Sequence, residues 1–521
     1  MPTSPPLLID GIHLTLEDIE RISRCESDVE LSDEARQAVV QSSSRLRKLV
    51  QSNEPIYGVN TGFGLLSDHV IQPDQLEDVS RNLILSHAVG VGAPFDRSVV
   101  RAAMLIRANT LVRGYSGVDI AIVDTLLAMI NRGVVPQIPS QGSLGSSGDL
   151  APLAHLALVL ADVSKPGVNS PGAMAWFEDE LLLGVDAMIR AEIPQCILGP
   201  KDGLGITNGA TFSAAILALG CMDLKQLLLT TEIAAAMSLE ALLGVSAAYD
   251  GRYHHARGHP GQVSVAERIL SYVQGSTLID LTDRLQDPYC LRCVPQVLGP
   301  VWDILEFVTH VVEREVNAST DNPLIFDEDV ISGGNFHGEP LGLAADYLKI
   351  AVAEIGSLSE RRTYRLTSPH TNEDLPPMLV SDHQMAGLNS GLMMLQYTAA
   401  SLVHENQHLA SPDTIYSVPT SGGQEDFNAN STTAARHLRQ TLDHLSYIIA
   451  VELICAAQAL DIRIKEQPET KLGGGSSAAL TCIREKVPFS ESDEFMSDNI
   501  QTVSELIKSG KLLSAVDAAS S

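Results

Sequence analysis

The sequence predicts a mainly α-helical protein, and three observations carry this prediction. Hydrophobic residues make up 45% of the 521 residues and charged residues only 19%, so the chain is not disordered and can bury a large core. Aromatic residues reach only 4%, so that core must be built from Leu, Ile, Val and Ala, which favours packed helices. Apolar residues in the second half recur at helical spacing, and nothing indicates a large sheet.

The expected elements follow in order along the chain. The first half has two glycine-rich loops, 57–64 and 142–148, and helical patterns over 32–53, 75–88, 98–116 and 150–163. Longer helical patterns follow over 341–362, 392–409 and 434–460, with short strands expected near Ile56-Tyr57 and over 323–326. A boundary near Pro200 is expected to divide a loop-rich N-terminal domain, 1–200, from a bundle of long helices, 201–521.

Charge and cysteine content restrict the partners and the compartment. The net charge of −29 argues against nucleic acid and anionic membranes, which both require a basic face. Seven scattered cysteines are typical of reduced thiols, so we expect a cytoplasmic protein. No secretory leader is expected at the N-terminus and no membrane span elsewhere; the nearest stretch, 445–460, is expected to be a buried helix. The helices carry broad apolar surfaces, which predicts self-association.

The loop that ends in Ser146-Ser147-Gly148 and Asp149 allows three interpretations. A phosphate cradle is disfavoured because no Gly-Lys-Ser/Thr follows and Asp149 would repel the anion. A tight turn with Asp149 as a helix cap is favoured by composition alone. In the third interpretation the tripeptide cyclises: the glycine amide nitrogen attacks the first residue's carbonyl carbon, and loss of two waters gives a methylidene-imidazolone ring (MIO). Only the carbonyl of the first residue is needed, so serine can stand there.

This loop and further motifs resemble those of the aromatic amino acid ammonia-lyases and aminomutases, and most of all those of the histidine ammonia-lyases. The resemblance runs from about residue 14 to about 487, and Ser146 stands where the family usually has alanine. The other matching motifs are Tyr57 to Gly64, Asn208-Gly209, Gln286 to Cys293, Asn317 to Pro323, and Asn335-Phe336-His337. The family fold is an MIO-bearing N-terminal domain followed by long helices, assembled as a homotetramer with active sites built from several subunits.

The resemblance implies a role for each matching residue. The MIO group would form from Ser146-Ser147-Gly148 without an external cofactor and would capture the substrate amine. Tyr57 would be the general base at the β-carbon, and Arg292 would bind the substrate carboxylate. The remaining matches would bind substrate, support the MIO group or form a wall of the pocket: Asn208, Gln286, Tyr289 and Phe336. No metal is expected.

Two positions bear on the substrate. His87, after Ser86, and Glu425 match residues of the histidine enzymes, and a carboxylate beside an imidazole would suit a histidine side chain. They predict conversion of L-histidine to trans-urocanate and ammonia. The histidine enzymes usually continue with His-Val-Ser-Met where this chain has Phe427-Asn428-Ala429-Asn430. A tyrosine or phenylalanine ammonia-lyase, or a 2,3-aminomutase, is therefore the alternative.

Functions of other classes rest on shorter patterns. His404-Glu405-x-x-His408 fits the zinc-peptidase pattern, with Glu425 as a distant candidate third ligand, but a polar stripe on a packed helix is the preferred interpretation. Cys290-x-x-Cys293 lacks a second pair and is not expected to bind metal. A non-catalytic helical assembly protein is the other alternative, and an MIO chromophore would exclude it.

Overall fold

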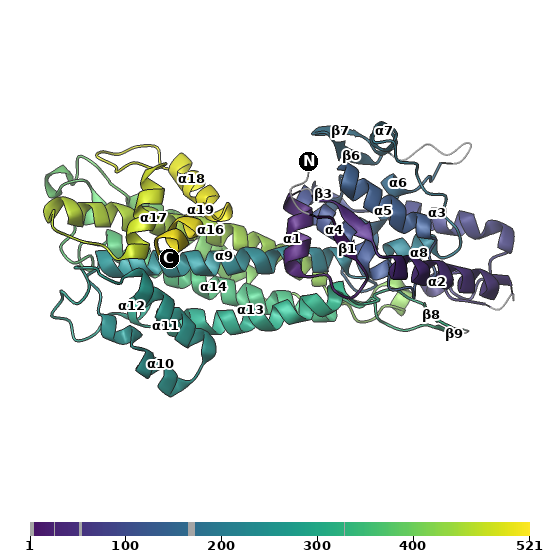
Figure 1. Cartoon of the computed structure of the whole chain (residues 1–521), viewed down its shortest axis with the longest axis horizontal. Coiled ribbons are helices and arrows are strands. Elements are labelled where there is room, and N and C mark those ends of the chain that lie inside the picture. The colour runs from purple at the N-terminus through teal and green to yellow at the C-terminus, as the bar shows by residue number, and fades with distance from the viewer. Residues whose placement is uncertain (1–4, 26, 52–54, 165–171, 328, 521) are drawn as a thin grey trace. The chain divides into compact units, whose positions relative to one another are not determined.

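The structure, a computed structural model, describes residues 5–25, 27–51, 55–164, 172–327 and 329–520 (Figure 1). Helices dominate, and the strands that the described residues form gather into sheets of only two or three strands. The mainly α class is therefore confirmed.

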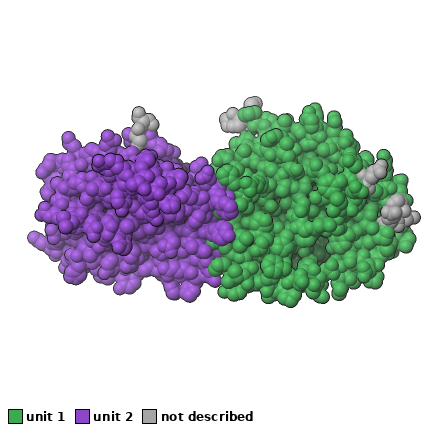
Figure 2. Space-filling model, turned by 90° about the horizontal axis from the view of Figure 1, so that it is seen from below, with its two compact units in different colours: residues 1–222, 308–346, 412–436 green, residues 223–307, 347–411, 437–521 purple. Residues whose placement is uncertain are grey.

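The chain forms two compact units, each made from three segments (Figure 2). Unit 1 comprises residues 1–222, 308–346 and 412–436, and unit 2 comprises residues 223–307, 347–411 and 437–521. Unit 1 thus contains the whole 1–200 segment and also takes two segments from the second half of the chain. Most of the divisions fall inside long helices: α9 (Thr211–Ala241), α13 (Val294–Val316), α14 (Glu339–Thr367) and α16 (Ser431–Glu466).

Unit 1 is built on short and medium helices around a buried centre. They are α1 (Leu16–Cys25), α2 (Asp33–Gln51), α3 (Leu76–His87), α4 (Arg97–Leu111), α5 (Ile120–Arg132), α6 (Leu150–Leu160), α7 (Gly184–Arg190) and α8 (Asp202–Thr207). Helix α4 packs against α1 and α5, while α3, α6 and α8 pack against one another. From Val99 to Leu111 every residue of α4 is buried, so this helix forms the centre of the unit.

Small sheets complete unit 1. Strand β1 (Leu7–Ile9) pairs in parallel with β2 (Val29–Leu31), and β3 (Val91–Pro94) pairs antiparallel with β5 (Pro139–Gln141). A three-stranded antiparallel sheet has the order β4 (Val135–Pro136), β6 (Met174–Phe177), β7 (Glu180–Leu183). Strand β8 (Leu324–Phe326) pairs antiparallel with β9 (Asp329–Ile331), which places Leu324 opposite Ile331.

Unit 2 combines the remaining parts of the long helices with shorter ones. The shorter helices are α10 (Gly251–Arg257), α11 (Pro260–Tyr272), α12 (Tyr289–Arg292), α15 (Met393–Leu409), α17 (Gly474–Arg484), α18 (Ser497–Lys508) and α19 (Lys511–Ser520). Glu452 of α16 is fully buried, where it accepts hydrogen bonds from Ser238 of α9 (2.7 Å) and Ser359 of α14 (2.6 Å). Arg362 of α14 pairs with the same carboxylate (Nε–Oε1 2.5 Å), so one buried charge links three helices.

Most expected elements are present, and one expected strand is wrong. The patterns over 75–88 and 392–409 correspond to α3 and α15, and the strand over 323–326 corresponds to β8. Ile56-Tyr57 belongs to a turn instead: the backbone N–H groups of Val59 and Asn60 both donate to the Ile56 carbonyl. The Asn60 side chain closes the turn by accepting from the Ile56 N–H (2.6 Å), which prevents strand pairing there.

Two helices, α9 and α16, are long and apolar enough by composition to span a membrane. In the structure 72% and 89% of the tested windows of these helices are buried, as expected for core helices of a globular protein. The cysteines whose side chains the structure describes are all free thiols.

Candidate active site

The tripeptide loop packs backbone to backbone against a second glycine. The Asp149 N–H donates to the Gly209 carbonyl (2.8 Å), and Gly148 and Gly209 form a bridge of the parallel type. Gly148 has φ +75°, and a Cβ at this position would collide with the Gly209 backbone. Glycine is therefore required at position 148 by conformation and by space. Ser146 and Gly148 are buried, whereas Ser147 between them is partly exposed.

The Asp149 side chain binds the tripeptide loop by hydrogen bonds and is not the helix cap that the composition had suggested. It stands at the N-cap position of α6, yet its side chain makes no capping hydrogen bond. The carboxylate instead accepts hydrogen bonds from the Ser143 hydroxyl (2.8 Å), the Ser213 N–H (2.8 Å) and the Thr432 hydroxyl. Burial raises the pKa of Asp149, and these hydrogen bonds act in the opposite direction. The capping interpretation is therefore wrong: the side chain ties the loop to α9 and α16.

Asn208 supplies a buried polar group beside the tripeptide. It precedes Gly209, and its Nδ2 donates to the Asn322 carbonyl (3.3 Å). Its Oδ1 is buried without a hydrogen-bond partner among the described residues. A buried amide oxygen left unpaired costs about 1–3 kcal/mol, so this atom fits a role toward a group formed at the adjacent loop.

Two buried cations and one carboxylate lie next to Asn208-Gly209. Fully buried Arg107 donates through Nη1 to the Asn208 carbonyl, and a Cβ at Gly209 would meet the same nitrogen. Lys201 and Asp321 form an ion pair of 2.6 Å with both side chains fully buried. Burial lowers the pKa of Arg107 to about 10, and the Asp321 carboxylate opposes this change. The members of this cluster come from three distant segments. Asp321 lies in the motif 317–323, but the sequence did not predict that the three side chains meet.

The charge of Glu425 acts on His87, and both residues belong to unit 1. His87 is the last residue of α3, and its Nδ1 lies 2.8 Å from the Leu83 carbonyl oxygen. Burial lowers the pKa of His87, while the hydrogen bond to Leu83 and the Glu425 carboxylate act to raise it. Glu425 accepts a hydrogen bond from the Thr420 hydroxyl (3.2 Å). Both residues therefore lie in unit 1, where the Glu425 carboxylate acts electrostatically on His87, and their role in selecting the substrate stays a prediction.

Tyr57 and Phe336 lie on loops that meet the same region. The Tyr57 hydroxyl accepts a hydrogen bond from the Gly64 N–H (3.2 Å), and a Cβ at Gly64 would contact the hydroxyl of Ser421, four residues before Glu425. Phe336 is partly buried. Two residues later, the Gly338 N–H donates to the Gly145 carbonyl (2.9 Å), which joins this loop to the tripeptide loop.

Gln286, Tyr289 and Arg292 belong to unit 2, where they lie on a braced segment. Gln286 and Tyr289 are exposed, the latter by 70%, and the Arg292 guanidinium lies over the Tyr289 ring at 4.7 Å. Arg292 also donates through Nε to the Asp287 carbonyl (2.7 Å). The motif thus presents a cation, a phenol and an amide at the surface of unit 2.

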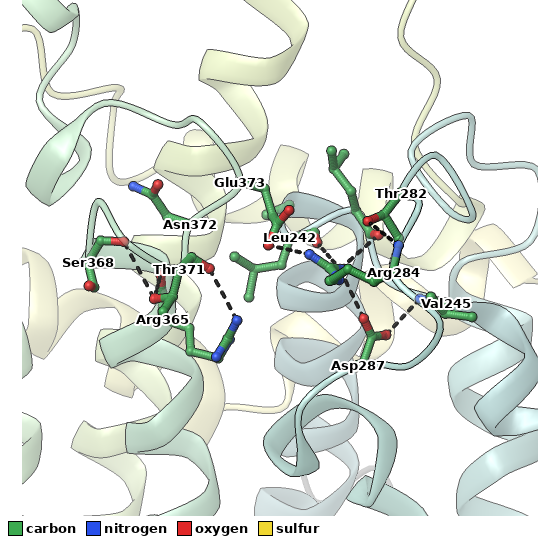
Figure 3. Close-up of polar contacts among 12 residues, drawn as sticks. Leu242, Val245, Thr282, Arg284, Asp287, Arg365, Ser368, Thr371, Asn372 and Glu373 are labelled. Atoms are coloured by element: carbon green, nitrogen blue, oxygen red, sulfur yellow. Dashed lines mark hydrogen bonds and ion pairs between the residues drawn. The ribbon is translucent and has the colours of Figure 1, made fainter.

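Asp287 and Arg284 supply the bracing (Figure 3). The buried Asp287 carboxylate accepts from the Val245 N–H (2.7 Å) and from Arg284 Nη2 (2.9 Å). Arg284 also donates to the Leu242 carbonyl (2.8 Å) and pairs with Glu373. Asp287 and Arg284 were not predicted as functional; their task is to hold the backbone that carries Tyr289 and Arg292.

The competing metal patterns have no site in the described part of the chain. No group of three or more His, Cys, Asp or Glu side chains there could hold a metal ion. The rings of His404 and His408 lie edge to face with centroids 4.6 Å apart, and Glu405 faces His444 (3.7 Å). Both histidines are exposed on α15, as expected for the polar stripe, and the zinc-peptidase interpretation lacks a third ligand.

Comparisons with known proteins agree with this geometry. The family model described as aromatic amino acid lyase matches residues 14–485. Histidine ammonia-lyase of Symbiobacterium thermophilum is 44% identical over 512 residues, and that of Treponema denticola is 42% identical over 517 residues; the matches cover 98% and 99% of each chain, respectively. The solved structure of tyrosine aminomutase from Streptomyces globisporus is 30% identical, with a TM-score of 0.92 over 99% of each chain.

The helical fold, the loop architecture and these matches define an enzyme of the carbon–nitrogen lyase class that acts as an ammonia-lyase. The chain belongs to the aromatic amino acid lyase family.

Proposed function

We propose that this enzyme is a histidine ammonia-lyase that converts L-histidine to trans-urocanate and ammonia. The observation that carries the proposal is the placement of His87 and Glu425 in the unit that holds the tripeptide loop. The curated relatives named histidine ammonia-lyase support it. A carboxylate beside an imidazole can accept the N–H of a substrate imidazole, which a phenyl ring lacks.

The electrophile proposed is an MIO group made from the chain itself. The Gly148 nitrogen bonds to the Ser146 carbonyl carbon. That carbonyl oxygen leaves as water with the amide hydrogens of Gly148 and Ser147, and a double bond forms between the Ser146 carbonyl carbon and the Ser147 nitrogen. Ser147 then loses its hydroxyl and its Cα hydrogen as a second water, which leaves a double bond between Cα and Cβ. The buried loop, the glycine requirement at position 148 and the unpaired Asn208 oxygen fit such a group. When present, it supplies an electrophilic carbon that takes up the substrate amine.

The remaining residues bind the substrate and move its proton. Tyr57, which already lies within hydrogen-bond distance of a backbone N–H, accepts the β-proton through its hydroxyl oxygen. Arg292 binds the substrate carboxylate with its planar guanidinium, and Gln286 and Tyr289 contribute to the same surface. Phe336 forms a wall of the pocket. Asn208 supports the tripeptide through the Asn208-Gly209 turn.

We also propose a cytoplasmic homotetramer. The exposure of Tyr289, with the Arg292 guanidinium over its ring, supports a site completed by contact with another surface. Unit 2 also exposes large apolar side chains along α13, α14 and α15, namely Phe307, Tyr347, Ile350 and Tyr397. Light scattering after size exclusion tests the proposal, and a monomer that retains full activity would contradict it.

A substrate panel tests the activity and separates it from the alternative. The enzyme is expected to prefer histidine over tyrosine and phenylalanine by kcat/KM and to release trans-urocanate, identified by mass and absorbance. The alternative, a tyrosine or phenylalanine enzyme that releases ammonia or returns it to the β-carbon, draws support from the match to tyrosine aminomutase and from exposed Phe427 in place of the usual histidine. Preference for tyrosine, or a β-amino acid product, would establish it.

A further inference from the structure

Two departures from the family pattern touch each other in this chain. Ser146 stands where the family usually has alanine, and Phe427 to Asn430 replaces the usual continuation after Glu425. The Ala429 N–H donates to the Ser146 hydroxyl oxygen at 2.9 Å, and the hydroxyl hydrogen points to the Leu144 carbonyl at 3.3 Å. Ser146 is 4% exposed and Ala429 is fully buried, so water does not compete for this contact.

The Ser146 hydroxyl is free for such a task. In the cyclisation proposed above, which this inference rests on, position 146 contributes only its carbonyl carbon and loses only its carbonyl oxygen. The hydroxyl is therefore retained in the finished enzyme. An alanine at this position would leave the buried Ala429 N–H without its acceptor.

The segment that follows Glu425 is pinned within its own loop by short hydrogen bonds. The Asn428 N–H donates to the Ser417 hydroxyl (2.7 Å), and Asn428 Nδ2 donates to the Val418 carbonyl. Backbone hydrogen bonds in both directions join Glu425 to Thr420. Residues 417–429 therefore form a closed loop whose parts hold one another in place.

Contacts to other segments set where this closed loop lies. His337 Nε2 lies 3.1 Å from the Phe427 carbonyl oxygen, and the two rings stack with centroids 6.3 Å apart. At the end of the loop, the Ser146 hydroxyl binds Ala429 and the Ser431 hydroxyl donates to the Gly145 carbonyl (3.2 Å). Ser146 thus links the tripeptide directly to the chain four residues beyond Glu425.

We propose that Ser146 is a positioning residue. Its hydroxyl sets substrate selectivity by holding the closed loop 417–429, which carries Glu425, against the tripeptide loop. Glu425 and His87 select the side chain of the substrate, while the tripeptide receives its amine. A substrate must reach both at once, so the separation of the two loops decides which side chain fits. The Ser146 hydrogen bond sets that separation at the tripeptide itself, beside the bond from Ser431 to Gly145.

The test compares Ser146→Ala with Ser146→Thr, which keeps a hydroxyl. Ser42→Ala is the matched control, because Ser42 is also buried in unit 1 and accepts a backbone N–H, that of Gly117 (3.0 Å). Intact mass is measured for every variant, and kcat and KM are measured for histidine and tyrosine. All variants are expected to be lighter than the translated chain by two waters.

Ser146→Ala is expected to lower the kcat/KM ratio of histidine over tyrosine by about fivefold or more, mainly through KM for histidine. Ser146→Thr is expected to stay within about threefold of wild type, and Ser42→Ala to leave the ratio unchanged even where it lowers stability. An unchanged ratio in fully modified Ser146→Ala would overturn the positioning role and leave the proposed function intact.

Two further outcomes separate this inference from the proposed function. If Ser146→Ala alone fails to lose the two waters, the hydroxyl acts in cyclisation and the positioning role is overturned. If the wild type prefers tyrosine, the histidine assignment fails, but a shift of the same ratio in Ser146→Ala still supports the positioning role. An active wild type of unmodified mass overturns both proposals.

Discussion

The ion pair of Lys201 and Asp321 allows a quantitative test of how the tripeptide region is supported. Both side chains are fully buried and their charged atoms lie 2.6 Å apart. Arg107 is also fully buried, and the Asp321 carboxylate offsets its positive charge as well. Asp321→Asn preserves the shape of the side chain and removes its charge. Both cations then lose this counter-ion while they remain fully buried.

Removing one partner of a buried ion pair costs about 3–5 kcal/mol, and we expect Asp321→Asn at the upper end because two cations depend on this carboxylate. Lys201→Met is the matched control. It removes one cation while Asp321 keeps Arg107 as its partner, so its loss should be smaller. The assay is equilibrium unfolding in guanidinium followed by tryptophan fluorescence, with Trp176 of β6 as the reporter in unit 1.

The two variants are compared by how much unfolding free energy each loses. A loss below about 1 kcal/mol for Asp321→Asn, or a larger loss for Lys201→Met, would refute the view that one carboxylate holds two cations beside Asn208-Gly209. If the account is correct, Asp321→Asn also lowers the fraction of chains that lose two waters, because Arg107 contacts the Asn208 carbonyl.

Three further predictions concern the proton, the substrate and pH. Tyr57→Phe should lower turnover by about 10²–10⁴-fold. The variant should still be lighter than its own translated chain by two waters. Residual activity above about a tenth of wild type would assign the base elsewhere, to Tyr289 first. Glu425→Gln should lower kcat/KM for histidine by about 10- to 150-fold and spare any slow reaction with tyrosine; an equal loss on both substrates would contradict a role in selectivity. Burial, reinforced by Asp149, raises the pKa of Glu315 to about 7 from 4.5. The folded chain therefore holds that proton more tightly, and the free energy of unfolding should fall by up to about 3 kcal/mol as pH rises from about 4.5 to about 7. Glu315→Gln should lessen this slope in the melting temperature, and an identical slope in both proteins would contradict it.

The helices were predictable because their signal is local. Leu341, Ala344, Leu348, Val352 and Ile355 recur at helical spacing, and all five are buried in α14. The end of α4 was placed too late, at Ser116, because Gly114 takes φ +77° after the helix stops at Leu111. A positive φ at a single glycine does not change the helical spacing of the apolar residues, so that spacing did not indicate where the helix ends.

Site residues were proposed from the sequence only where a motif contained them. Tyr57, Asn208 and Glu425 lie in segments that resemble a family, and the family resemblance supplied their roles. The partners of Asp149 could not be found this way, because Ser213 and Thr432 lie 64 and 283 residues away. Contacts over such separations depend on how helices pack, which one sequence does not encode in any local pattern.

The division of each unit into three chain segments also depends on how distant helices pack. The predicted boundary near Pro200 separates a loop-rich part from long helices along the chain, and the structure adds residues 308–346 and 412–436 to the compact unit that contains 1–200. Those segments carry Phe336 and Glu425, so the proposed site depends on a chain that leaves unit 1 and returns to it. A division read along the sequence cannot show that these two later segments pack into unit 1.

The most direct test of the account is the mass of the peptide that contains Ser146-Ser147-Gly148, isolated from freshly purified, active enzyme. We expect a mass lower than that of the encoded peptide by two waters, produced without any added cofactor. Ser147→Ala should show no loss of two waters and should also lack activity. An unmodified peptide from enzyme that still releases ammonia from histidine would contradict the formation of an MIO group from Ser146-Ser147-Gly148, because the electrophile would then have to come from elsewhere.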